Sequence, residues 1–216
     1  MFYSTDERMK YNCELNIFDL RDGADLEPRQ KIPIPKSKIT SAIWTQLDDT
    51  IVTGHANGEI CQYDLREGIE PTNFVKEHKN AIQDLQLSKN QTMLISASKD
   101  NTSKLFDAYN LEHIKSYKSE RPVNGASICP TKDVVLLGGG EEAMTVTQTD
   151  TRQGKFEAKF YHLIFEDEFA RVKGHFGPLN TVAFAPDGGG YCSGSEDSYV
   201  RLHRFDQDFF NFDYDC

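Results

Sequence analysis

The sequence has few cysteines and no long apolar run. The five cysteines, Cys13, Cys61, Cys129, Cys192 and Cys216, are scattered without a CxxC pair, so neither a zinc site nor a disulfide framework is indicated. With 38% hydrophobic residues, the 216-residue chain can fill a core but offers no stretch that would span a membrane. We expect a soluble cytoplasmic protein, kept reduced, with no membrane partner.

Positive charge is also scarce. The chain holds 24 lysines and arginines against 34 acidic residues, a formal charge of −10. Contacts with nucleic acid or an anionic membrane need clustered basic side chains that neutralise phosphates. We therefore expect no direct binding of nucleic acid.

Two familiar kinds of cofactor site are missing as well. The six histidines fit no spacing typical of a metal site. The triplets Gly138–Gly140 and Gly188–Gly190 lack the patterns of phosphate-binding loops, and we expect both to form turns. The sequence thus predicts neither a metal nor a cofactor.

What the sequence does contain is a repeat with a step of roughly 43 residues, the period of a four-stranded propeller blade. Ile39 aligns with Ile82, and Tyr63-Asp64 aligns with Phe106-Asp107. A further copy begins near Leu179. Short apolar runs bounded by Gly, Asp and Asn clusters favour strands over helices. The repeat predicts an all-β propeller.

We expect residues 1–216 to form one propeller domain, because a single blade cannot bury both faces of its sheet. The pattern predicts about four and a half blades in an incomplete ring. The predicted units are a partial blade at 1–20, blades at 37–76 and 78–117, a diverged blade at 121–173 with an insertion at 139–154, a last blade at 174–205, and an acidic aromatic tail at 206–216.

The insertion at 139–154 breaks the repeat with a long irregular segment. Such segments in compact domains bind a partner or are tolerated without a role. Glu141 and Glu142 are accordingly candidate partner-binding residues.

A trio of polar residues occurs twice at the same spacing. His78, Ser96 and Asp100 recur as His175, Ser193 and Asp197. A hydrolase triad uses these residue types, yet nothing in catalysis requires one trio per blade. A buried hydrogen-bonded network explains the repetition better, so we expect no enzyme, and a Ser-His-Asp hydrolase is the less favoured alternative. The first full copy carries Pro35, Thr53 and Asn57 instead.

Several segments carry a family resemblance. Tyr63-Asp64 and Phe106-Asp107 stand where WD40 repeats have Trp-Asp. More specifically, FDLRDG from Phe18, SASKDNTSKLFD from Ser96 and GGGEEAM from Gly138 resemble the family of subunit i of eukaryotic translation initiation factor 3. Members of that family have seven blades, and by this resemblance the chain begins partway through the third.

The resemblance implies a non-catalytic scaffold that docks subunits b and g of the factor. Such a scaffold supports recruitment of the 40S ribosome and scanning, with indirect contact to the ribosome. It also implies that a helical segment of b contacts the end of the SKLFD strand, with Leu105 as an apolar anchor and Asp107 as an acceptor for a basic side chain. A WD40 signalling adaptor at a receptor kinase is the alternative that the sequence leaves open.

Overall fold

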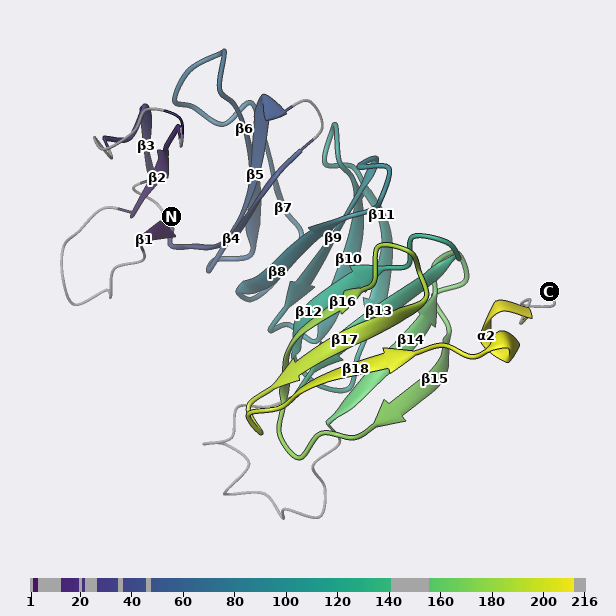
Figure 1. The fold of residues 1–216 in the computed structure, drawn as a ribbon. Coiled ribbons are helices and arrows are strands. Elements are labelled where there is room, and N and C mark those ends of the chain that lie inside the picture. Colours follow the sequence, from purple (N-terminus) through teal and green to yellow (C-terminus); the bar gives the residue numbers. More distant parts are fainter. Residues whose placement is uncertain are drawn as a thin grey trace.

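The computed structural model describes residues 2–3, 13–19, 21, 27–34, 37–45, 48–140 and 156–211 (Figure 1). Its regular structure is almost entirely antiparallel β-strand, which confirms the all-β prediction. In this part of the chain the only helix is α2 (Gln207–Asn211), and no helix is long and apolar enough to cross a bilayer.

Three of the five sheets have four strands each, joined in chain order. They comprise β4 (Ile39–Trp44), β5 (Thr50–His55), β6 (Glu59–Asp64) and β7 (Asn73–Lys76); β8 (Ile82–Leu87), β9 (Met93–Ser98), β10 (Thr102–Asp107) and β11 (His113–Lys118); and β12 (Val123–Ile128), β13 (Val134–Gly139), β14 (Glu157–His162) and β15 (Glu168–Lys173).

The first and last sheets have three described strands each. They are β1 (Phe2–Tyr3), β2 (Cys13–Ile17) and β3 (Gln30–Ile34), and β16 (Leu179–Phe184), β17 (Gly190–Ser195) and β18 (Val200–Arg204). The partial blade predicted over 1–20 is therefore too short, because β3 pairs with β2 and extends this sheet to Ile34.

Each sheet between the first and the last packs against a neighbour on both faces. Successive residues of a strand point to opposite faces. In β9, Leu94 accordingly packs toward the β4–β7 sheet while Ile95 packs toward the β12–β15 sheet. In β10, Phe106 packs toward the β4–β7 sheet and Leu105 packs toward the β12–β15 sheet. This alternation buries an apolar cluster between each pair of neighbouring sheets, as stacked blades require.

The first strands of successive four-stranded sheets, β4, β8 and β12, lie next to one another, with β16 beside β12. Close approach requires small residues at two points. A side chain at Gly54 would meet Ile82 Cγ2 at 2.7 Å, and one at Gly138 would meet Val182 Cγ1 at 2.5 Å. Gly138 and Gly139 thus lie inside β13, and the prediction that the whole Gly138–Gly140 triplet forms a turn is wrong.

The sheets follow one another in chain order, with the N-terminal sheet on the far side of the molecule from the C-terminal sheets (Figure 1). Among the described strands, none of the β1–β3 sheet pairs with one of the β16–β18 sheet. This arrangement is that of an incomplete WD40 propeller. The helix α2 follows β18, and Phe209 stacks on Phe205 with ring centroids 3.9 Å apart, so this part of the tail covers its own blade.

Candidate functional site

The first predicted trio is assembled by three separate elements of the β8–β11 sheet. His78 precedes β8, Ser96 lies in β9, and Asp100 lies in the turn between β9 and β10. His78 Nδ1 lies 2.9 Å from Asp100 Oδ2, and Nε2 lies 2.7 Å from Ser96 Oγ. Because a carboxylate only accepts hydrogen bonds, Nδ1 carries the proton and donates it to Asp100. Burial lowers the pKa of His78, which keeps the imidazole neutral.

Asp100 is held by further donors. The Lys79 N–H donates to Oδ2 at 3.0 Å, and the Thr102 hydroxyl donates to Oδ1 at 2.6 Å. Burial opposes ionisation of this carboxyl, but the hydrogen bonds from Thr102, Lys79 and His78 hold the pKa of Asp100 below its ordinary value. The network therefore joins the segment before the blade to the turn between its second and third strands.

The second trio has the same geometry in the β16–β18 sheet. His175 Nε2 lies 2.8 Å from Ser193 Oγ, and Nδ1 lies 3.0 Å from Asp197 Oδ2. Burial works against the charge of Asp197, but the N–H groups of Phe176 and Tyr199, with His175, lower its pKa to about 2. The structure thus brings the members of each trio within hydrogen-bond distance of one another.

The two serines are buried. Ser96 is 0% exposed and Ser193 is 2% exposed. A nucleophile must reach the carbonyl carbon of its substrate and lie beside an oxyanion-binding site. Neither hydroxyl reaches the surface in this structure, and the geometry of both trios is that of an internal network.

In the β4–β7 sheet, which corresponds to the first full copy of the repeat, the buried Thr53 hydroxyl has a different hydrogen-bond partner. Thr53 Oγ1 lies 2.9 Å from Nε2 of His55, which comes from the same strand, β5. Asn57 Oδ1 accepts the Glu59 N–H in the following turn, and Pro35 lies outside the described residues. Burial lowers the pKa of His55. The sequence pattern of the trio did not predict a role for His55, although its position two residues after Thr53 was an available signal.

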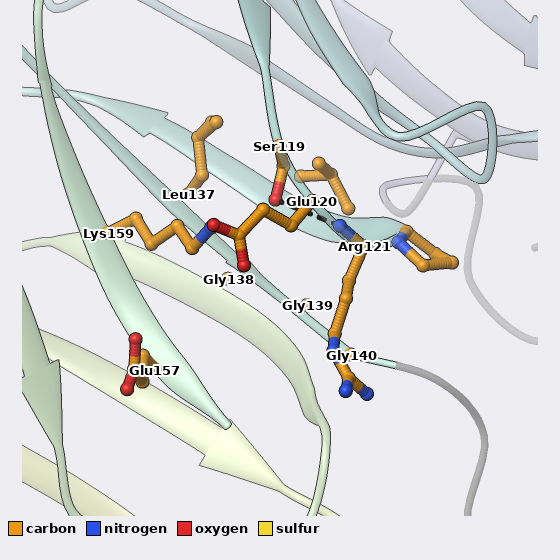
Figure 2. Close-up of a pocket in the computed structure, with 11 residues that line it drawn as sticks. Ser119, Glu120, Arg121, Leu137, Gly138, Gly139, Gly140, Glu157 and Lys159 are labelled. Atoms are coloured by element: carbon orange, nitrogen blue, oxygen red, sulfur yellow. Dashed lines mark hydrogen bonds between the residues drawn. The ribbon is translucent and has the colours of Figure 1, made fainter. Parts of the chain in front are cut away.

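In the β12–β15 sheet, the diverged blade, ion pairs lie near the position that the trio has in other blades. A small cavity of about 20 Å³ is lined by Ser119, Glu120, Arg121 and Lys159, among others. Figure 2 shows these side chains. The cavity volume is about what one water molecule needs. Around it, Arg171 pairs with Glu120, Glu157 and Glu168, and Lys159 pairs with Glu168 at 3.8 Å.

Leu105 is a core residue. It is 2% exposed and packs in the cluster between the β8–β11 and β12–β15 sheets. The interpretation of Leu105 as an apolar anchor for a partner is therefore corrected, because a buried side chain offers no surface to an incoming helix. The sheet packs on both faces, so neither side of β10 at this position points to solvent.

Asp107 lies at the surface end of the same strand. Its Oδ1 accepts the Tyr109 N–H at 2.8 Å and the Asn110 N–H at 3.2 Å, which fixes the turn between β10 and β11. Tyr109 in that turn is 89% exposed. The structure thus gives Asp107 a turn-stabilising role and presents an aromatic ring beside it.

Asp107 also lines a groove of about 580 Å³ between the β4–β7 sheet and the β10–β11 turn. The charged residues that line it are four carboxylates, Asp49, Asp64, Glu67 and Asp107, and one basic residue, Arg66, among uncharged Thr, Gln and Asn side chains. Arg66 pairs with Asp64 at 2.8 Å and with Asp49 at 3.3 Å. The hydrogen bond from Arg66 lowers the pKa of Asp64 to about 2. The groove is therefore acidic, and its charge suits a basic partner.

The remaining candidates are not all visible. Glu141 and Glu142 lie outside the described residues. Within the described ranges, no group of three or more His, Cys, Asp and Glu side chains is placed to hold a metal ion.

Comparisons with known proteins give a consistent result. The family model EIF3I matches residues 1–215. "Eukaryotic translation initiation factor 3 subunit I" of Rattus norvegicus is 55% identical over 219 aligned residues, which cover 100% of this chain and 67% of that protein. The Homo sapiens protein of the same description has the same identity and coverage, and the Taeniopygia guttata protein is 54% identical.

Proposed function

The chain belongs to the family of subunit I of eukaryotic translation initiation factor 3, and from that premise we propose that it is a docking scaffold of this factor. In this proposal it binds subunits b and g in the cytoplasm and supports 40S recruitment and scanning without touching nucleic acid or membrane itself. The observation that carries the proposal is the 55% identity to two subunit I proteins over the whole chain.

The acidic groove lined by Asp107 is a suitable place for the contact with subunit b. Its carboxylates attract a basic segment, and the exposed Tyr109 ring at its rim offers an apolar or cation–π contact to an arriving side chain. We propose that a helical segment of subunit b lies in this groove, with Asp107 facing a basic residue of that helix. The apolar contact that the sequence analysis assigned to Leu105 passes in this proposal to Tyr109.

Charge reversal at Asp107 tests this assignment. We expect Asp107→Lys to weaken capture of subunit b on the order of tenfold or more, because it replaces an attraction by a repulsion. Asp107→Asn should weaken capture less, since the amide oxygen still accepts the turn N–H groups while the charge is lost. The measurement is quantitative pull-down of purified subunit b, with circular dichroism of each variant.

The matched control is Glu196→Lys, which reverses an exposed charge in the turn between β17 and β18. Capture by this variant should equal that of the unmodified chain. Equal capture by Asp107→Lys and Glu196→Lys would remove Asp107 from the interface.

A further inference from the structure

The turn between the third and fourth strands is capped in the same way in several blades. An aspartate at the end of β6 and of β10, and one just after the end of β2, accepts a backbone N–H two residues later. Asp19 accepts the Arg21 N–H at 3.0 Å, Asp64 the Arg66 N–H at 2.9 Å, and Asp107 the Tyr109 N–H at 2.8 Å. The sequence repeat therefore specifies a carboxylate at this position.

The diverged blade has a histidine at the equivalent position. His162 Nδ1 accepts the N–H of Ile164 at 3.2 Å and that of Phe165 at 3.3 Å. The rest of the turn matches the β10–β11 turn bond for bond. Glu166 N donates to His162 O as Leu111 N donates to Asp107 O, and Glu166 and Leu111 both have positive φ, 64° and 57°. The imidazole nitrogen thus replaces the carboxylate oxygen.

A histidine acts as such a cap in only one protonation state. In the neutral ring, one nitrogen carries a proton and the other accepts, so Nδ1 is here the unprotonated nitrogen. Protonation places an N–H on Nδ1, where it faces two backbone N–H groups, and both hydrogen bonds are lost. An aspartate in the same place remains an acceptor through the whole range in which imidazoles titrate.

Charged groups surround this turn. Glu166 and Asp167 lie within it, and Glu168 begins β15. From the neighbouring sheet, Lys115 on β11 pairs with Glu166 at 3.2 Å. On the β13 side, the Asp133 carbonyl accepts the Leu163 N–H at 2.8 Å. The turn therefore remains attached at Leu163 and Glu166 when its His162 cap is lost.

We propose that His162 makes the β14–β15 turn a pH-sensitive segment of the propeller rim, closed when the imidazole is neutral and loosened when it is protonated. The turn carries Ile164 and Phe165, which are 51% and 44% exposed. Leu163 at its start lines a groove of about 450 Å³ between the β8–β11 and β12–β15 sheets. Loosening the turn changes the position of the exposed Ile164 and Phe165 side chains.

Amide hydrogen exchange by NMR, at about pH 7.5 and about pH 5.5, tests the inference on the full chain. After correction for the intrinsic pH dependence of exchange, we expect protection of the Ile164 and Phe165 amides to fall on the order of tenfold at the lower pH, as two hydrogen bonds are lost. The Tyr109 amide, capped by Asp107, is the internal reference and should keep its protection.

The matched variant is His162→Asp, which installs the residue that the other blades use. Its Ile164 and Phe165 amides should be equally protected at both pH values. The inference is overturned if the unmodified chain keeps its protection at the lower pH, or if His162→Asp loses protection to the same extent. No partner is present in this experiment, so its outcome is independent of the docking proposal.

Discussion

Replacing Leu105 with alanine is expected to lower the free energy of unfolding by about 2–5 kcal/mol, the range for removing a buried leucine side chain. Leu105 is 2% exposed and contacts apolar residues of two sheets, so the cavity left by the substitution lies between blades. Urea denaturation followed by circular dichroism measures the change. A loss of subunit b capture in this variant would report on the fold and not on a direct contact.

Asp107, two residues further along β10, lies at the surface and serves as the comparison for Leu105. Asp107→Asn keeps the turn acceptor and removes no core volume, so its free energy of unfolding should change by less than about 1 kcal/mol. If Leu105→Ala were as stable as Asp107→Asn, Leu105 would not be a core residue and our correction of its role would fail.

Replacing His78 with alanine is expected to lower the free energy of unfolding by about 2–3 kcal/mol near pH 7.5. The imidazole bridges Ser96 and Asp100, and its removal leaves both buried groups short of a partner. The exposed His113 is the control, and His113→Ala should change stability by about 0.5 kcal/mol or less. Equal effects of the two substitutions would mean that the network contributes nothing to stability.

His78→Ala should also alter the pH dependence of the free energy of unfolding. Burial holds the pKa of His78 below its ordinary value of 6.5, so the unfolded chain takes up this proton at a higher pH than the folded chain does. The stabilisation by neutral His78 is thus complete above about pH 6.5 and is lost as the pH falls below it. The difference in free energy of unfolding between the unmodified chain and His78→Ala should therefore become smaller as the pH falls. His55, whose pKa burial also lowers, contributes with the same sign in both proteins.

Much of the architecture is predictable because it is local and repeated. The alternation of apolar residues and the turn residues between them place the strands, and the constant spacing of the trio predicts the contacts of His78 and His175. These contacts follow from one blade geometry used twice. The β4–β7 sheet, from Ile39 to Lys76, lies within the blade predicted over 37–76.

Other features depend on contacts between segments that no repeat relates. The burial of Leu105 follows from the β12–β15 sheet packing on that face. The ion pairs of Arg171 combine Glu120, Glu157 and Glu168 from different segments, and no spacing rule connects them. The cap made by His162 departs from the aspartate of the other blades, and its acceptor role is visible only in the geometry of the turn. The repeat predicts the arrangement of the strands, whereas the contacts that differ from blade to blade are found only in the structure.

We propose that subunit b docks in the acidic groove beside the β10–β11 turn. Site-specific photo-crosslinking from position 109 tests it most directly, because Tyr109 is 89% exposed at the rim of that groove. We predict a crosslink to subunit b from a photoreactive residue at 109 and none from the same residue at Tyr199, which is 63% exposed in the last sheet. A complex that forms without a crosslink at 109, or with equal crosslinks from both positions, would mean that subunit b does not dock in this groove.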